Sequence, residues 1–478
     1  MRRTLLLAAL LLAPLAALRA AEPPKPAGKP NIVFILFDDM GYGEPPCFRA
    51  DSGFKTPNLD RLARQGMRFT DAHTAASVCT PTRYGLMTGR YPCRIGQYGV
   101  LDHFSPPIIE KQRTTVASLL RSQGYNTACL GKWHLGMNFV RHGKDKEAAV
   151  GTPVADGPVT RGFDIFCGYT EARSIGTIIG NDRIVAHDEP VEVQPMLAKK
   201  AEAYLEQRRP GQPFFLYVPL CVPHVPIVPS EEFTGKSRSG PYGDWILEGD
   251  AVVGQIMAAL DRGKLAENTL LLVSSDNGAA KRVYAPLRGC KTSIYEGGHR
   301  VPFLARWPGK IKPGAVCDDT ICLNDLLATC AEVVGAKLPD NAGEDSVSIL
   351  PDLLRTAHHP VREATVHQSP AGELAIRQGP WKLIFFKGSR RELYNLQDDL
   401  SETRDQLAAK PEIVQHLTKL MEQYIANGRS TPGAVQKNDA DISLDGKQGK
   451  AKGRGKAKQK QRARSKQEVN LAMDPDFD

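Results

Sequence analysis

The sequence predicts an α/β fold in which helices sandwich a mixed, mostly parallel sheet. Three runs of apolar residues, 31–37, 214–218 and 269–273, show no polar alternation, which is typical of strands buried on both faces of a parallel sheet. Amphipathic helical patterns lie between these runs. They cover residues 57–66, 115–124 and 246–260.

The C-terminal part has a different pattern, which predicts a small antiparallel sheet plus one helix. Short strand patterns separated by turns occupy 374–377, 381–386 and 391–394, and a helical pattern covers 411–427. Beyond Gly433 the composition cannot bury enough apolar surface to fold, so we expect a disordered basic tail. The expected organisation is a signal peptide (1–21), a leader (22–30), a large α/β domain (31–360), a C-terminal α+β subdomain (361–433) and the tail (434–478).

The N-terminus predicts export. Met1-Arg2-Arg3 precedes an apolar run from Leu5 to Leu18, and small residues follow at Ala20-Ala21. A basic start, a short apolar stretch and small residues describe a secretory signal. The run is shorter than the roughly 20 residues needed to span a bilayer, although an N-terminal anchor is the alternative. We therefore expect a periplasmic or secreted protein without a transmembrane anchor.

Composition and charge are those of a globular protein with a basic extension. The 478 residues are 41% hydrophobic and 24% charged, which excludes collagen-like, coiled-coil and wholly disordered classes. The formal net charge of +9 becomes about −4 once ten Lys or Arg in 447–466 and three N-terminal Arg are set aside. The charge therefore does not predict specific nucleic-acid binding. The tail is either a solvated extension or an attachment to sulfated glycan or a cell surface.

The ten cysteines form neither a disulfide scaffold nor a zinc motif. They are scattered along a long chain, and no Cys-x-x-Cys pair occurs. If one cysteine serves chemistry, the remaining nine cannot all pair.

Polar side chains follow each of the three buried strands. Asp38-Asp39 follow 31–37, His224 follows 214–218, and Asp276-Asn277 follow 269–273. Ligands bind beyond the carboxyl ends of the strands in such sheets, so these groups are expected at one edge. Oxygen ligands of this kind favour Ca²⁺, with Mg²⁺ as the other choice, over zinc. Each Asp pair alone could instead be a solvated or capping turn.

A cysteine stands at the expected start of a helix. In the segment 77–89, Cys79 precedes Pro81, a residue common in the first helical turn, and Arg83 adds a cation. A thiol at a helix N-terminus lies at the positive end of the helix dipole. The alternative is a buried structural cysteine.

Further cations and histidines complete the set. The segment 124–134 resembles a strand that places Lys132 and His134 on one face, because they are two residues apart. Lys291 lies in a Gly-rich loop. A hard cation with fixed positive groups suits a tetrahedral oxyanion, since these groups can hold its developing charge. The residues alone predict a sulfate- or phosphate-ester hydrolase and leave the nucleophile open.

Two motifs carry a family resemblance. Cys79-Thr-Pro-Thr-Arg83, with the following Tyr-Gly-Leu-Met-Thr-Gly89, resembles the signature of the type I, formylglycine-dependent sulfatases of the alkaline phosphatase superfamily. The segment from Gly124 to His134 resembles their second signature, and the similarity extends from Asn31 to about Leu396. Thr82 stands where Ser is commoner, and Leu130 where a smaller residue is usual.

The resemblance implies an alkaline-phosphatase-like fold, sulfatase activity and a role for each residue. Cys79 would be converted by a formylglycine-generating enzyme to formylglycine (3-oxoalanine), whose hydrate is the nucleophile and also a ligand of one Ca²⁺. The other metal ligands would be Asp38, Asp39, Asp276 and Asn277. The catalytic groups would be Arg83 and Lys132 on the hydrate and sulfate oxygens, His134 as base, and His224, the better candidate acid, with Lys291 at the bridging oxygen. His299 would be at most a supporting residue, and no assisting Ser or Thr is assigned.

Two other functions remain open at this stage. A phosphoester or phosphonate monoester hydrolase of the same superfamily is the nearest alternative. A non-catalytic polyanion-binding protein acting through the tail is the other. The expected substrate is a sulfated carbohydrate or aryl sulfate, chosen by loops such as 100–104 and 169–182. Oligomeric state and disulfide pairing are not predicted.

Overall fold

A ten-stranded mixed sheet forms the centre of the molecule. The computed structural model describes residues 28–140, 148–356 and 360–445, so the predicted signal peptide and the basic segment 446–478 lie outside the described residues. The strand order is β13-β2-β12-β11-β1-β10-β4-β7-β8-β9. The bounds are β1 Asn31–Asp38, β2 Met67–Phe69, β4 Asn126–Lys132, β7 Ile165–Tyr169, β8 Thr177–Gly180, β9 Arg183–His187, β10 Phe214–Pro223, β11 Thr269–Ser275, β12 Phe303–Arg306 and β13 Ala315–Cys317.

The five central strands, β11, β1, β10, β4 and β7, run parallel. Each predicted buried strand is present and extends further than its apolar run. Strand β12 pairs antiparallel with β11, and β8 and β9 add an antiparallel edge. The sheet is therefore mixed and mostly parallel, as predicted. Two small sheets, β3 (Ala72–His73) with β14 (Ile321–Cys322) and β5 (Asn138–Phe139) with β6 (Val154–Asp156), lie outside it.

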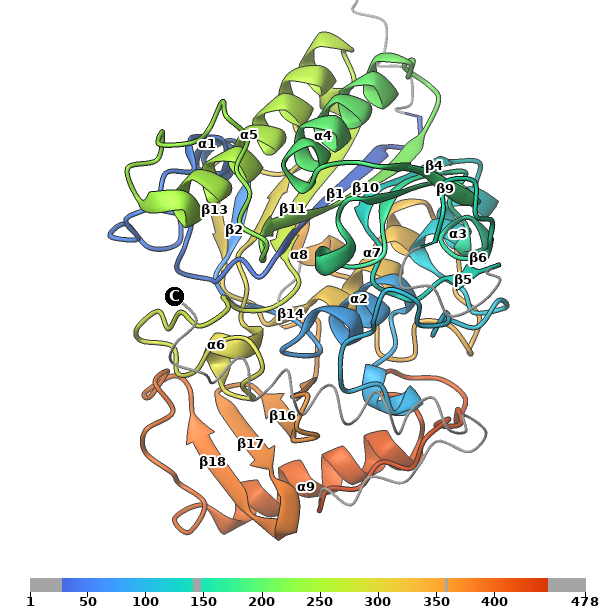
Figure 1. Cartoon of the computed structure of the whole chain (residues 1–478). Coiled ribbons are helices and arrows are strands. Elements are labelled where there is room, and N and C mark those ends of the chain that lie inside the picture. The colour runs from blue at the N-terminus through green and yellow to red at the C-terminus, as the bar shows by residue number, and fades with distance from the viewer. Residues whose placement is uncertain (1–27, 141–147, 357–359, 446–478) are drawn as a thin grey trace, which may run out of the picture.

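Helices cover both faces of this sheet (Figure 1). Alternate residues of β1 belong to two separate cores: Ile32 and Phe34 pack in one, Val33 and Ile35 in the other. This explains the unbroken apolar run, since both strand faces are buried. The helices of the large domain are α1 Pro57–Gln65, α2 Cys79–Thr88, α3 Val116–Ser122, α4 Pro190–Glu206, α5 Gly240–Arg262, α6 Glu296–His299, α7 Leu326–Val333 and α8 Leu350–Leu353.

The C-terminal part is a four-stranded antiparallel sheet with one helix across it (Figure 1). Its elements are β15 Thr365–Gln368, β16 Leu374–Gln378, β17 Trp381–Phe385, β18 Arg391–Asn395 and α9 Pro411–Ala426. The sequence predicted three of these strands and the helix, and missed β15. Its core is shared with the large domain, since Ala75 and Tyr91 pack in the same cluster as Leu383 and Leu417.

The prediction of disorder from residue 434 was wrong for its first part. Residues 434–445 have no helix or strand, but they lie against the large domain. Arg90 donates hydrogen bonds to Asp439 and to the Lys437 carbonyl, and Arg94 donates to Asn438. Arg90 and Arg94 of the large domain therefore hold this polar segment in place, and the amino-acid composition of the segment does not show these contacts.

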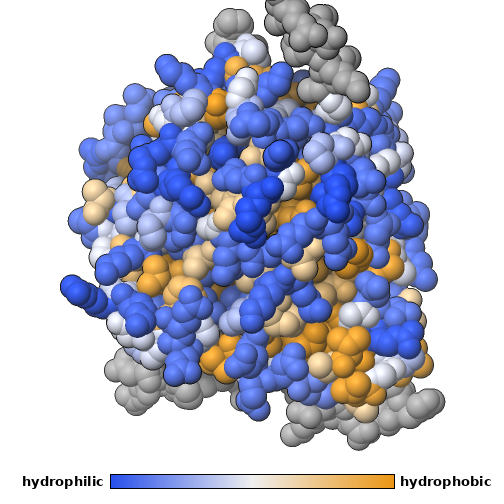
Figure 2. Space-filling model, turned by 90° about the horizontal axis from the view of Figure 1, so that it is seen from above, coloured by the Kyte–Doolittle hydropathy of each residue, from blue (hydrophilic) through white to orange (hydrophobic). Residues whose placement is uncertain are grey.

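The outer surface is mainly hydrophilic. The view from above shows charged and polar residues over most of the face, with apolar residues in smaller groups (Figure 2). Within the described part of the chain, the helices are all too short or too polar to cross a bilayer.

Candidate active site

Two acidic turns meet at the carboxyl edge of the parallel strands. Because β1 and β11 are in parallel register, Asp38 and Asp39 end beside Asp276. The Asp39 backbone N–H donates to Asp276 Oδ1 at 3.1 Å. Asp39 has a φ of 72°, a left-handed conformation that turns the chain sharply after the strand. The predicted convergence of these carboxylates is thus present.

Cys79 is the first residue of α2 and lies against both strand-end carboxylates. Its Sγ is 3.4 Å from Asp38 Oδ1 and 4.0 Å from Asp39 Oδ1. The side chain is 1% exposed. Burial, followed by the charge of Asp276, raises the pKa of the Cys79 thiol well above its usual value. The helix end and nearby cations do not offset this, so the thiol itself is a poor nucleophile at neutral pH.

Three cations face the three carboxylates. Lys132 Nζ lies 2.6 Å from Asp38 Oδ2, and Lys291 Nζ lies 2.7 Å from an Asp39 carboxylate oxygen. Burial alone would raise the pKa of Asp38, but the charges of Lys132 and Arg83 outweigh it and hold that pKa well below its usual range. Asp38 therefore stays ionised.

Arg83 closes the third ion pair. Its Nη2 donates to Asp276 Oδ2 at 2.7 Å, and its Nε donates to the same oxygen at 3.0 Å. Burial raises the pKa of Asp276 to about 6, although Arg83 opposes the shift. Another guanidinium nitrogen donates to the Lys132 carbonyl, which ties α2 to the end of β4.

His134 reaches the same region by a route other than the predicted one. Strand β4 ends at Lys132, and His134 has a φ of 53°, so the two residues do not share a strand face. Its Nε2 lies 2.9 Å from the Leu101 carbonyl and must donate to it. Nδ1 therefore keeps its lone pair, and it is buried without a partner among the described residues. Burial, then Lys132 and Arg83, lower the pKa of His134 well below its usual value.

His224 follows β10, as predicted, and faces Asp39. Its Nε2 lies 3.7 Å from Asp39 Oδ2, while Nδ1 is 2.6 Å from the Val225 carbonyl. Burial and the charge of Lys291 lower the pKa of His224 to about 4. The ring is thus neutral until a negative charge arrives beside it.

The donor set fits a hard divalent cation. Asp38, Asp39, Cys79 and His224 offer ligand atoms that all lie within 4.8 Å of one another. Asn277 donates its Nδ2 to Asp39 Oδ1 at 2.7 Å, which leaves Asn277 Oδ1 buried and unpaired among the described residues. An orphaned amide oxygen beside carboxylates is the environment that Ca²⁺ or Mg²⁺ completes.

The ten predicted residues therefore form one cluster, which we call the polar edge. Its members are Asp38, Asp39, Cys79, Arg83, Lys132, His134, His224, Asp276, Asn277 and Lys291. His299 is not among them and belongs to a separate buried network.

Sequence reasoning included Thr170 only as part of the loop 169–182 and assigned no role to its buried hydroxyl. It follows β7, the parallel neighbour of β4, and its carbonyl accepts a 2.7 Å hydrogen bond from the His134 N–H. Its Oγ1 contacts His103 Nδ1 in one of the loops expected to choose the substrate. The same carboxyl-end rule would have found it, had the short run 165–169 been taken as a parallel strand.

Comparison with known proteins identifies the family. The sequence profile described as "Sulfatase" matches residues 30–336. The chain belongs to the sulfatase family. A second profile, "N-sulphoglucosamine sulphohydrolase, C-terminal", matches residues 290–429.

Individual relatives agree with this assignment. The chain is 32% identical to an N-acetylgalactosamine-6-O-sulfatase of Bacteroides thetaiotaomicron, over 82% of this chain and 93% of the relative. It is 34% identical to human arylsulfatase A, over 86% and 89%. A solved structure from work on glycosaminoglycan metabolism by Bacteroides thetaiotaomicron superposes with a TM-score of 0.75 at 28% identity, covering 83% of this chain and 99% of that one. The sulfatase is therefore a sulfuric ester hydrolase with the family's alkaline-phosphatase-like fold.

Proposed function

We propose that this sulfatase hydrolyses sulfate esters through a formylglycine hydrate formed at Cys79, with one Ca²⁺ bound at the polar edge. The observation that supports this most is the placement of Cys79 at the start of α2, against Asp38 and Asp39. A carbonyl hydrate at this position offers hydroxyl groups where the thiol offers none. The ligands proposed for the ion are Asp38, Asp39, Asp276, Asn277 and residue 79, and Mg²⁺ is the second choice.

Substrate binding is proposed to depend on charge. The cluster holds three carboxylates and three cations, so a bound divalent ion would leave it positive and complementary to a sulfate monoester anion. The ion would supply charge stabilisation to the hydrate and to the sulfate oxygens. Lys132 and Arg83 are placed to hold the hydrate and sulfate oxygens, while Lys291 is placed for the bridging oxygen.

In the first step, the hydrate reacts with one hydroxyl already deprotonated to solvent and its negative charge held by Lys132 and Arg83; this oxygen attacks sulfur, and the bond between sulfur and the bridging oxygen breaks. We assign His224 to protonate the departing alcohol. The anionic ester beside its ring favours the imidazolium, which burial and Lys291 otherwise disfavour. The product at residue 79 is a sulfate ester with one remaining hydroxyl.

In the second step, His134 takes the proton of that remaining hydroxyl. Its unpaired Nδ1 is the available base, because Nε2 is held as a donor by the Leu101 carbonyl. The C–O bond to sulfate then breaks, sulfate leaves, and the aldehyde forms again. Water rehydrates it. A serine or cysteine at position 79 could not release sulfate in this way.

The substrate is proposed to be a sulfated carbohydrate, with aryl sulfates as the simpler class. The relatives named above include an enzyme acting on N-acetylgalactosamine 6-sulfate, and another solved relative at 26% identity and TM-score 0.70 is a complex with a neocarrahexaose.

We further propose export to the periplasm or outside, after maturation by a formylglycine-generating enzyme. The division at 360/361 into catalytic domain and C-terminal subdomain remains a proposal too.

The decisive test combines mass spectrometry with turnover. Protein made together with a formylglycine-generating enzyme should show the Cys79 peptide in its aldehyde form and hydrolyse an aryl sulfate. Cys79→Ala should lower kcat at least about 10⁴-fold, as loss of a nucleophile does. An intact thiol in active protein, or an undiminished Cys79→Ala variant, would overturn the proposal. A matched aryl phosphate separates the phosphoesterase alternative, which predicts faster phosphate than sulfate hydrolysis.

A further inference from the structure

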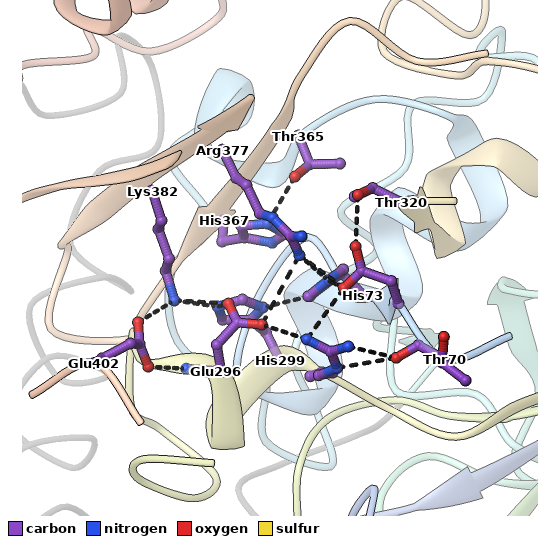
Figure 3. A network of polar contacts seen from close by, with 12 residues as sticks. Thr70, His73, Glu296, His299, Thr320, Thr365, His367, Arg377, Lys382 and Glu402 are labelled. Carbon is purple, nitrogen blue, oxygen red and sulfur yellow. Dashed lines mark hydrogen bonds and ion pairs between the residues drawn. The ribbon is translucent and has the colours of Figure 1, made fainter. Parts of the chain in front are cut away.

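A second buried polar cluster lies below the polar edge, between the large domain and the C-terminal sheet (Figure 3). We call it the His–Lys network. It comprises three carboxylates (Asp71, Glu296, Glu402), three cations (Arg300, Arg377, Lys382) and three histidines (His73, His299, His367). Burial is the main cause that lowers the pKa of each histidine, so the rings are neutral, and burial also raises the pKa of Glu402 to about 7.

The spacing of this network would also suit a metal, but its atoms are already engaged. His73, His299 and His367 have ligand atoms close enough to share one ion. His367, however, has its two ring nitrogens at 2.9 Å from the Thr74 carbonyl and Thr365 Oγ1. The position that such an ion would occupy also lies among the three cations of the network, Arg300, Arg377 and Lys382. The network is therefore a closed structural unit whose function must be indirect.

Lys382 is the centre of the network. It extends from β17 of the C-terminal sheet and is fully buried. Its ammonium has three protons and three acceptors: Glu402 Oε1 at 2.8 Å, Glu296 Oε1 at 3.0 Å and His299 Nε2 at 3.0 Å. Two of these acceptors belong to α6 of the large domain. One side chain thus satisfies groups from both parts of the molecule.

The hydrogen bonds of Lys382 also fix the tautomer of His299. Because the ammonium can only donate, His299 Nε2 accepts and the ring proton is on Nδ1. That proton points to His73 Nδ1, 3.1 Å away, while His73 Nε2 lies 2.9 Å from both Asp71 Oδ1 and Arg377 Nη1. A continuous set of polar contacts therefore runs from the C-terminal sheet to β3, the strand that precedes Cys79.

Helix α6 is hydrogen-bonded to the backbone of two segments that lead to the polar edge. The His299 carbonyl accepts from Thr74 N at 2.8 Å, five residues before Cys79. The Gly298 carbonyl accepts from Gly278 N at 3.0 Å, directly after Asn277. The backbone at Gly278 packs directly against α6, because a Cβ at Gly278 would lie only 1.8 Å from the Gly297 carbonyl oxygen.

The two loops that carry Cys79 and Lys291 are joined to each other as well. Thr292 N donates to the Ser77 carbonyl at 2.8 Å, and Ser77 N donates to the Gln368 carbonyl of β15 at 3.0 Å. Movement of α6 would therefore displace Cys79, Asn277 and Lys291 together.

We propose that Lys382 is a positioning residue for the sulfatase reaction: by holding Glu296 and His299, it keeps α6 in the place that aligns Cys79, Asn277 and Lys291. This inference rests on the proposed function, because it assumes that these three groups act together. It assigns to the C-terminal sheet a part in turnover through Lys382.

The test compares Glu402→Gln with the double variant Lys382→Gln/Glu402→Gln. The double variant removes one basic and one acidic group together, so no buried ammonium or carboxylate loses its partner alone, and its difference from Glu402→Gln measures the loss of the Lys382 ammonium and its contacts. Rates are measured with an aryl sulfate, well below each variant's unfolding temperature, and divided by the fraction of Cys79 converted to the aldehyde. We expect kcat per converted site to fall at least about tenfold relative to Glu402→Gln, with KM within about twofold, because small misplacements of reacting groups cost rate.

The matched control is Arg161→Gln. Arg161 is another buried cation, paired with Asp156 at 2.5 Å and bound to the Ile109 carbonyl, away from α6. It should lower the unfolding temperature while leaving kcat per converted site unchanged. A double variant with the kcat of Glu402→Gln would overturn the inference. Wild-type protein that hydrolyses the aryl sulfate with an unconverted thiol would instead overturn the proposed function.

Discussion

The polar edge and the His–Lys network contain the same charges and differ in how those charges are satisfied. Each contains three carboxylates and three cations. In the network, none of the fully buried side-chain nitrogens and oxygens of those described residues lacks a partner. In the polar edge, Asn277 Oδ1 and His134 Nδ1 have none among the described residues, and Lys291 and His224 keep 16% of their side chains exposed. Unpaired atoms and partial access, rather than charge, mark the place where a ligand can bind.

The largest expected effect is the loss of a cation from the polar edge. Lys132→Met removes the partner of Asp38 and a charge placed for the sulfate oxygens. We expect kcat/KM for an aryl sulfate to fall by about 10²–10³. The paired measurement is the unfolding temperature, which separates lost catalysis from lost folding. A Lys132→Met enzyme within tenfold of wild type would break the comparison, because the polar edge would then be as purely structural as the network.

The second largest expected effect is the stabilisation by calcium, which should depend on the polar edge and not on the His–Lys network. At about 100-fold excess over its dissociation constant, an ion that binds only the folded state stabilises by about 2.7 kcal/mol. We expect calcium added after chelation to raise the unfolding temperature of the wild type. Asn277→Ala removes the orphaned oxygen and should abolish most of this rise.

The control for the calcium experiment is Glu402→Gln, in the closed network. It should keep the full calcium-dependent rise. A rise that disappears in Glu402→Gln and persists in Asn277→Ala would place the ion in the wrong cluster.

Asp352, on α8, tests whether an unpaired buried oxygen alone identifies a site. Both of its carboxylate oxygens lack hydrogen-bond partners among the described residues. Burial, together with the charge of Asp319, raises the pKa of Asp352 to about 7. The folded state therefore binds a proton more tightly than the unfolded state, so this contribution to stability is complete at low pH and is lost as pH rises through about 7.

Asp352→Asn should remove that pH dependence and leave kcat unchanged. Relative to the variant, we expect the wild type to lose about 2 kcal/mol of unfolding free energy between about pH 5 and about pH 8.5. Denaturant unfolding at both pH values measures it. Parallel pH curves for the two proteins would contradict the assignment.

The smallest effect should come from removing residues 446–478. Turnover of a small aryl sulfate and the unfolding temperature should both match the full chain, because the contacts at the C-terminal end of the described chain are made before this point. Removing residues 437–478 should instead lower the unfolding temperature, since Asp439 pairs with the buried Arg90. Equal stability of the two truncations would show that the segment 434–445 contributes nothing.

The sequence predicted those parts of the molecule that depend on local pattern and on the geometry of parallel sheets. The strand at β1 and the position of Asp38 follow from an unbroken apolar run and from the carboxyl-end rule. The spacing argument for His134 was wrong. Its two-residue spacing from Lys132 indicated a shared strand face, but β4 ends at Lys132, and the left-handed backbone conformation of His134 itself brings the ring to the site.

The His–Lys network could not be predicted from the sequence. Lys382 lies in the strand pattern 381–386 and has the spacing of an ordinary outward-facing polar residue. Its acceptors, Glu296 and Glu402, are 86 and 20 residues away. Their meeting depends on how the C-terminal sheet docks, which no local signal encodes. The same reason explains why the ordered segment 434–445 was mistaken for the start of the tail.

The burial of Cys79 has a consequence for the proposed maturation. In the folded chain its sulfur is enclosed by α2 and the two acidic turns, with 1% of the residue accessible. If a maturation enzyme oxidises this cysteine, as proposed above, the folded chain would hide its target. On that proposal, oxidation would precede folding, and a chain that folded first would remain an inactive thiol.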